Sequence, residues 1–214
     1  MKPDAMLLLN LCQIEERMAP MPGSRVRTRL SVEQRRRQLI QLGMEMFSSR
    51  AYEDILIEEI AHQAGISRGL LYHYFPNKRD FYLAVSKAAV DEIRDLTEPD
   101  PSLPAIEQVR RALDVFLRKA KERSEGFLTA YRGALAADPE VRGLVEASRV
   151  FQSTRVLKAL GRRDPTPLLQ LAVRGWVGLV QDVTAQWLQH RALDGEEVRD
   201  MLVATLEGAI AGAS

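Results

Sequence analysis

The sequence predicts an all-α protein, and three observations support this fold class. Apolar residues recur at helical spacing along most of the chain, and no segment shows the apolar–polar alternation of a half-buried strand. Ala, Leu, Arg and Glu, which favour helices, are abundant, whereas aromatic residues make up only 6% of the chain. Helix-capping residues stand where the helical patterns begin, and Gly or Pro stands where several of them end.

The first helix is predicted over residues 32–49. Ser31 and Gln34 fit a capping box, in which the serine oxygen accepts from an unpaired amide and the glutamine reaches back to the cap. The residues that follow share one helical face: Leu39, Ile40, Gly43, Met44 and Phe47.

Two short helices are predicted next, over residues 57–64 and 68–75. Gly65 tolerates the positive φ that a tight turn between them requires. Ser67 is placed to cap the second of these helices, and Pro76 ends it because proline disfavours a helical residue before it.

A fourth helix, capped by Asn77, is predicted over residues 78–96. Three prolines then crowd residues 98–104, which marks this segment as the boundary between two functional regions. Beyond it, proline, glycine and capping residues delimit five longer helices, over residues 104–124, 125–137, 139–160, 167–191 and 195–210.

The composition restricts the class of protein. Of the 214 residues 46% are hydrophobic, enough for a core, and the net charge is only +1. The single cysteine, Cys12, excludes an internal disulfide, so a reducing cytoplasmic location is expected. The apolar run at residues 5–9 is too short to span a bilayer, and no membrane association is expected. Residues 1–24 are expected to form a flexible tail.

Positive charge is concentrated in the N-terminal third. Residues 21–90 hold eleven Lys/Arg against seven Asp/Glu, a net charge of +4, whereas residues 91–214 hold seventeen against nineteen, a net of −2. Six arginines fall within thirteen residues: Arg25, Arg27, Arg29, Arg35, Arg36 and Arg37. Such a cluster is by itself more often a solvated face than a nucleic-acid contact, so its meaning depends on the neighbouring elements.

Residues 60–75 have the features of a helix-turn-helix. Ala61 is small enough for two helices to approach closely, and Gly65 turns the chain. Ile66 and Leu71 can fill the space between the helices, so that the second helix presents polar and aromatic side chains to a major groove.

The stretch from Ala61 to Lys78, ending Leu-Tyr-His-Tyr-Phe-Pro-Asn-Lys, resembles the DNA-binding signature of the TetR family of transcriptional regulators. The resemblance covers residues 31–85; the later helices match in number and length. It implies a helix-turn-helix DNA-binding domain of three helices at residues 25–80. The fourth helix would join this domain to a helical ligand-binding and dimerisation domain at residues 81–214.

The resemblance implies DNA contacts position by position. Arg68 would reach base edges, Gly69 would allow close approach of the helix, and Lys78 would meet a phosphate. The basic arm before the first helix would enter the minor groove. The full set is Arg25, Arg27, Arg29, Ser67, Arg68, Gly69, Tyr72, His73, Tyr74 and Lys78. Phe75 and Leu71 are better explained as core.

Two positions depart from the family pattern. The family usually has Ser or Thr before the second helix, where it caps that helix and often bonds a phosphate, and this chain has Leu56. It also often has Thr at the position of Leu70. Leucine donates no hydrogen bond, so both departures remove expected phosphate contacts.

The resemblance also implies roles for the later helices. The last two would pair with their copies in a homodimer, which two half-sites on DNA also favour. The middle helices would enclose a pocket for a partly apolar effector. Candidate lining residues are Phe116, Phe127, Tyr131, Arg132, Phe151, Arg155, Trp176 and Asp182, with Leu117, Leu128, Leu135, Val180 and Gln181 beside them. Apolar and aromatic residues at helical spacing are more often plain core than pocket wall.

The expected function is therefore that of a dimeric repressor, bound to palindromic double-stranded operator DNA and released by a small-molecule effector. An activator of the same fold is an alternative. A helical interaction module with degenerate DNA binding is another, and Leu56 and Leu70 are its best support. An enzyme is disfavoured, because the sequence shows no catalytic triad, phosphate loop or metal-ligand spacing, and no cofactor is expected.

Overall fold

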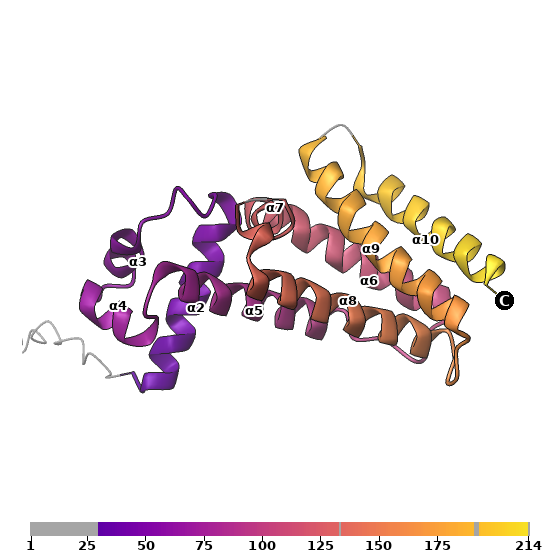
Figure 1. Cartoon of the computed structure of the whole chain (residues 1–214), viewed down its shortest axis with the longest axis horizontal. Helices are drawn as coiled ribbons and strands as arrows, with labels where there is room; N and C mark the ends of the chain where they lie inside the picture. Colours follow the sequence, from indigo (N-terminus) through magenta and orange to yellow (C-terminus); the bar gives the residue numbers. More distant parts are fainter. Residues whose placement is uncertain (1–29, 133, 191–192, 214) are drawn as a thin grey trace, which may run out of the picture. The chain divides into compact units, whose positions relative to one another are not determined.

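The helices of this chain follow one another with short connections (Figure 1). The computed structural model describes residues 30–132, 134–190 and 193–213, and within these ranges no strand occurs, which confirms the all-α class. Residues 35–214 form one compact unit, and the described part of residues 1–34 contains the start of the first helix. The helices are α2 (Val32–Ser49), α3 (Ile57–Gln63), α4 (Arg68–Tyr74), α5 (Lys78–Leu96), α6 (Ala105–Glu122), α7 (Ser124–Tyr131), η1 (Ala134–Ala137, a 3-10 helix), α8 (Pro139–Ala159), α9 (Pro167–Gln189) and α10 (Gly195–Gly212).

The helix boundaries agree closely with the sequence patterns, with one exception. α2 and α5 begin and end at the predicted residues. The exception is the segment 125–137, predicted as one helix, which forms α7 and then the separate helix η1. The prediction of one helix is wrong because the backbone leaves the helical region at Arg132, with φ −139° and ψ −10°.

The predicted caps form. The Ser31 hydroxyl accepts from Gln34 N at 3.1 Å, and the Gln34 side chain accepts from Ser31 N at 2.8 Å. Asp194 forms the second capping box with Glu197 at the start of α10. Gly65 adopts the positive φ of 63° that the turn between α3 and α4 requires.

The first hydrophobic core joins α2 to α5. Leu39, Ile60, Leu71 and Phe81 are each 0% exposed and come from four different helices. Gly43 of α2 permits the close crossing of α5, because a Cβ at this position would lie 2.5 Å from Val85 Cγ2 and 2.6 Å from Phe81 Cζ. This core packs against the inner side of α4 and leaves the outer face of α4 exposed.

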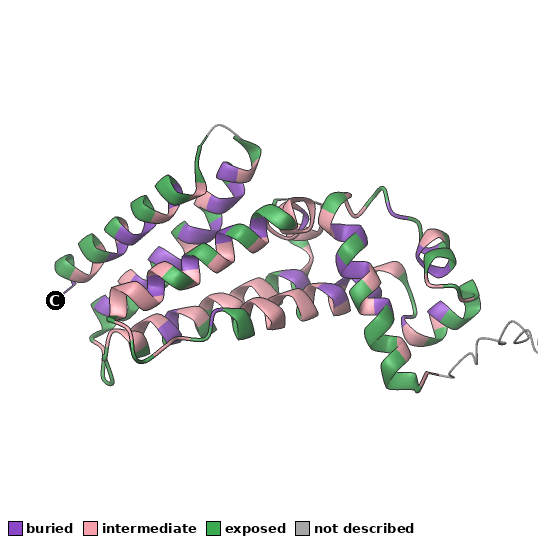
Figure 2. Cartoon of the chain, turned by 180° about the vertical axis from the view of Figure 1, so that it is seen from behind, coloured by how far each residue is buried: buried purple, intermediate pink, exposed green. Residues whose placement is uncertain are grey.

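The second core lies among α6, α9 and α10, whose buried faces turn toward one another (Figure 2). Val173, Leu202 and Leu206 are fully buried. The Trp176 indole donates to Leu202 O at 2.8 Å, so the polar atom of this buried ring is satisfied. No helix in the described ranges combines the length and apolarity needed to cross a bilayer.

α5 joins the helix-turn-helix to the later helices and packs along α8. Near its start, Arg79 donates to both carboxylate oxygens of Asp138, at 2.6 and 2.9 Å, and to Glu140 at 2.9 Å. The hydrogen bonds from the Arg79 guanidinium hold the pKa of Asp138 at about 2, below its usual value of 3.8. Nearby, Gly126 of α7 allows close packing on α2, since a Cβ there would lie 3.0 Å from Phe47 O.

Candidate functional site

The outer face of α4 is the first candidate site. Arg68, Gly69, Leu70 and His73 are exposed on it, whereas Leu71 on the opposite side is fully buried. The helix is therefore anchored by an apolar side chain below and presents its first turn to solvent, the arrangement that a recognition helix requires.

The first turn of α4 is well ordered by local hydrogen bonds. The Ser67 hydroxyl accepts from Leu70 N at 3.2 Å and caps the helix. At the C-terminal end of α4, Phe75 is 2% exposed, which confirms that this ring belongs to the core. Tyr72 and Tyr74 are half-buried, and the rings of His73 and Tyr74 meet edge to face at 5.6 Å.

Arg68 is held across the turn between the two helices. Its guanidinium pairs with Glu58 of α3 at 2.7 Å, donates to the Tyr72 hydroxyl at 3.4 Å and lies 5.3 Å from the centre of the Tyr72 ring. The hydrogen bond to Tyr72 and the charge of Glu58 raise the pKa of Arg68. Because the ion pair between Arg68 and Glu58 is exposed, little free energy would be lost if Arg68 left Glu58 and bound a base or a phosphate instead.

Lys78 opens α5, where the helix N-terminus also favours an anion. Its ammonium lies 4.2 Å from the centre of the Tyr52 ring and 3.5 Å from Glu53 O. Partial burial lowers the pKa of Lys78. Asn77 caps the same helix through Asp80 N at 2.8 Å, so the lysine stands on a fixed backbone.

The two residues that depart from the family pattern, Leu56 and Leu70, are both exposed to solvent. Leu56 is 62% exposed and occupies the N-cap position of α3, where no side-chain hydrogen bond forms. Leu70 is also exposed. Arg25, Arg27 and Arg29 lie outside the described residues, but Arg36 of the same basic cluster stacks on Phe75, 5.2 Å from the ring centre.

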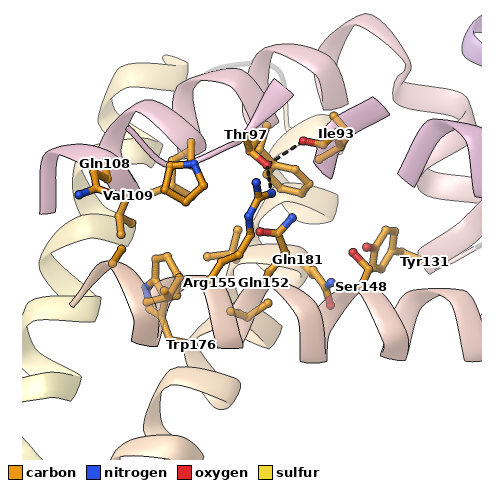
Figure 3. A pocket seen from close by; sticks show the side chains of 18 residues that line it. Ile93, Thr97, Gln108, Val109, Tyr131, Ser148, Gln152, Arg155, Trp176 and Gln181 are labelled. Carbon is orange, nitrogen blue, oxygen red and sulfur yellow. Dashed lines mark hydrogen bonds between the residues drawn. The ribbon is translucent and has the colours of Figure 1, made fainter. Parts of the chain in front are cut away.

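The second candidate site is a cavity of about 100 Å³ among α5, α6, α8 and α9 (Figure 3). Most of its wall is apolar and includes Phe116, Trp176 and Val180. Its polar wall comes from Thr97, Gln108, Tyr131 and Gln181 and from one face of α8: Ser148, Gln152 and Arg155. One water-sized group needs about 10–15 Å³ of cavity volume, so this cavity has room for several such groups.

A second cavity of about 150 Å³ lies next to the first. The two share Ile93, Phe116, Tyr131 and Ser148 as lining residues. The second also reaches the helix-turn-helix region, because Met44 and Phe47 of α2 form part of its wall. A molecule in these cavities would therefore touch α2 as well as α5, α6 and α8.

Comparisons with known proteins agree with this geometry. The family model of the bacterial regulatory proteins of the TetR family matches residues 39–85, and the model of the tetracyclin repressor-like C-terminal domain matches residues 106–207. The transcriptional regulator AcuR of Cereibacter sphaeroides is 30% identical over 163 residues, which cover 66% of this chain and 73% of AcuR.

The chain belongs to the TetR family. A crystal structure of a TetR-family transcriptional regulator from Streptomyces coelicolor is similar, with a TM-score of 0.81 and 31% identity over 86% of this chain and 83% of that one. The transcriptional activator FasR of Mycolicibacterium smegmatis is 25% identical over 86% of this chain and 85% of its own. The protein is thus a transcriptional regulator of the TetR family.

The predicted ligand residues of this TetR-family regulator fall into two groups. Phe116, Tyr131, Arg155 and Trp176 line the first cavity, and Phe127 lines the second. The other three predicted residues line neither cavity. Arg132 and Asp182 instead form an ion pair at 2.8 Å on the surface, and Phe151 is exposed, with Arg94 and Arg155 on its ring.

Several residues at these sites were not predicted from the TetR-type sequence. Glu58 pairs with Arg68 across the turn between α3 and α4, and Tyr52 lies against Lys78, which follows it after two helices. No local sequence pattern connects either pair. Ser148 and Gln152 line the cavity together with Arg155. Their spacing of four and three residues along α8 was a usable signal, because polar residues on the inward stripe of a helix indicate a face that is not packed core.

Proposed function

We propose that this TetR-family regulator binds a palindromic operator as a homodimer, represses the genes beside it, and releases the DNA when a small molecule occupies the cavity. The exposed first turn of α4 carries the proposal. Ser67, Arg68 and Gly69 stand there on a buried base formed by Leu71, with Lys78 at the start of the next helix. These are the residue types that contact phosphates and guanine edges.

The operator is tested first, with DNA from immediately upstream of the protein's own gene and with a random operator library. Binding is measured at two salt concentrations, for the wild type, for Arg68→Ala and for Arg118→Ala as a control, since Arg118 is an exposed arginine on α6. Saturable, salt-sensitive binding that falls about tenfold or more with Arg68→Ala alone supports the proposal.

Other outcomes have distinct meanings. Equal losses for both variants would indicate only a charged surface. Absence of binding at low salt would favour a helical interaction module, the alternative that the exposed Leu56 and Leu70 support.

The homodimer is proposed from an uncovered face of α9 and α10. Leu171, Leu179 and Met201 are 69%, 39% and 43% exposed, and small residues lie among them. A Cβ added at Gly175 or Gly208 would have nothing within 4 Å, so a second backbone has room to approach there. Dimerisation would place two recognition helices on half-sites about 34 Å apart.

The oligomeric state is tested by sedimentation equilibrium on the double variant Leu171→Glu/Met201→Glu. We expect monomers, because burying two carboxylates in an apolar interface is costly. Val150→Glu is the control, since Val150 is an exposed apolar residue on α8. A double variant that remains as dimeric as the control would contradict the proposed interface.

The direction of regulation is tested in cells with a reporter behind the identified operator. We expect expression to rise when the regulator is removed. FasR, a similar protein, is named an activator, so a fall in expression is the outcome that would replace repression by activation.

A further inference from the structure

Arg155 is the one charged side chain in the wall of the first cavity, among the residues that the structure describes. Its side chain is only 10% exposed. NH1 donates to Arg94 O at 2.6 Å and to Thr97 Oγ1 at 3.3 Å, and NH2 donates to the Glu98 carboxylate. The Nε–H group has no acceptor within the described part of the chain. Among the described residues, Glu98 is therefore the one hydrogen-bond partner of the guanidinium edge formed by Nε and NH2.

Two polar groups that line the cavity with Arg155 can donate hydrogen bonds. The Gln181 carbonyl oxygen already accepts from Arg149 at 3.1 and 2.9 Å, which leaves the Gln181 amide hydrogens for another acceptor. The Tyr131 hydroxyl is protonated at neutral pH and can donate, and burial raises its pKa further, to about 12. No aspartate or glutamate belongs to the described lining of this cavity. A cationic ligand would meet Arg155 without a compensating carboxylate.

We infer that the effector is an apolar carboxylic acid, bound as its anion with the carboxylate on the Nε–NH2 edge of Arg155 in place of Glu98. This inference rests on the proposed function, because it names the effector of the proposed cavity. The flat guanidinium edge matches a carboxylate in a two-bonded geometry. The apolar wall around Trp176 and Phe116 suits the remainder of the molecule.

Replacement of Glu98 by the carboxylate of the ligand costs the protein little free energy. Glu98 is 76% exposed, so its carboxylate returns to water when it leaves Arg155. The incoming carboxylate gains a more buried, charge-assisted pair.

The same guanidinium connects the cavity to the helix that leads to the recognition helix. Arg94 O and Thr97 belong to the C-terminal end of α5, where a cation also compensates the helix dipole. Figure 3 shows the Thr97 hydroxyl beside the Arg155 guanidinium. α5 starts at Lys78, directly after the α4 region. A ligand that pulls the guanidinium further into the cavity lengthens the NH1 hydrogen bonds to this end of α5, and the effector then acts through that helix.

The probes are dodecanoate, dodecanol and dodecylammonium, each below its micelle concentration, with binding measured by titration calorimetry on the full-length protein. We expect the wild type to bind dodecanoate most tightly. Arg155→Gln should weaken dodecanoate about tenfold to a hundredfold while changing dodecanol little, because only the charged pair is lost. Arg142→Gln is the matched control, an exposed arginine on the same helix.

Glu98→Gln gives the opposite sign and does not depend on a variant that weakens folding. Removing the competing carboxylate should tighten dodecanoate by up to about fivefold. In the wild type, hydrogen exchange at the last turn of α5 should accelerate when dodecanoate is bound.

Operator binding without any probe is measured on the same preparations, so that failure of the proposed function is detected separately. Equal affinity for the three probes, or dodecanoate binding that ignores Arg155, would overturn the inference and leave the DNA-binding proposal intact. Binding that needs Arg155 but leaves both exchange at α5 and the Glu98→Gln affinity unchanged would overturn the exchange with Glu98.

Discussion

Substitution of Gly43 by alanine tests how tightly α2 crosses α5. The added methyl group would lie 2.5 Å from Val85 Cγ2 and within 2.9 Å of two carbons of the Phe81 ring. Both neighbours are buried, at 4% and 0% exposure, so neither can turn away into solvent. The variant must therefore shift one helix or force a side chain out of its rotamer.

The expected magnitude follows from two opposing effects. Alanine is favoured over glycine inside a helix by about 0.5–1 kcal/mol. Overpacking of a well-filled core costs about 1–3 kcal/mol. Gly143→Ala on α8 is the control, because a Cβ there meets nothing within 4 Å and gains only the first effect. The difference between the two variants is then the steric cost alone, about 1–3 kcal/mol.

The assay is urea unfolding at one fixed protein concentration, since the stability of a dimer depends on concentration. A lower midpoint at an unchanged slope would report the lost stability of Gly43→Ala relative to Gly143→Ala. If Gly43→Ala were as stable as Gly143→Ala, the close crossing of α2 and α5 would be refuted.

Four further outcomes are expected. Gly69→Ala, where a Cβ meets nothing within 4 Å, should leave stability unchanged or higher yet weaken operator binding in a gel-shift titration; unchanged binding would remove Gly69 from the interface. Leu56→Thr should supply the missing cap of α3, raise stability by about 1 kcal/mol and tighten operator binding, and a variant no more stable than wild type would argue against it. Leu71→Ala should lower stability by about 2–5 kcal/mol in urea unfolding, because its side chain is fully buried; a loss below about 1 kcal/mol would contradict that burial. The lowered pKa of Asp138 means that its pair with Arg79 contributes stability above pH 3.8 that is lost as the pH falls toward about 2; the advantage of wild type over Asp138→Asn in thermal unfolding should shrink over that range, and a constant advantage would exclude the ion pair as its source.

The sequence predicted most of the secondary structure because the signals are local. Capping boxes at Ser31 and Asp194, the cap at Asn77 and the turn at Gly65 each act within four residues, and all of them form. The helix-turn-helix was equally accessible, since its buried and exposed positions alternate at helical spacing within a short segment. The segment around Arg132 was the failure: Gly133 directly follows the break, and a glycine at this position often marks the end of a helix, but the prediction of one helix did not use this signal.

A candidate site was predicted better when its residues lie close together in the sequence. The candidate DNA-contact residues of α4 were named from the family resemblance. The structure shows that Arg68, Gly69 and His73 are exposed opposite the buried Leu71, and their contacts with DNA stay a prediction. The cavity required knowing which faces of α5, α6, α8 and α9 meet, and three of the eight predicted lining residues, Arg132, Phe151 and Asp182, lie elsewhere. Residue type alone did not distinguish an arginine in a surface ion pair from Arg155 in the cavity wall.

By itself the sequence determined the all-α class and most of the helix order, because helical periodicity, caps and turns depend on neighbours along the chain. The resemblance of residues 61–78 to the TetR signature added the assignment of the recognition helix. Only the tertiary structure decided which arginine faces the cavity, which carboxylate it holds and which end of α5 it supports. Those pairings join residues about sixty positions apart, such as Arg155 with Arg94 and Arg79 with Asp138. Contacts at that separation arise only once the helices have packed, so no local pattern specifies them.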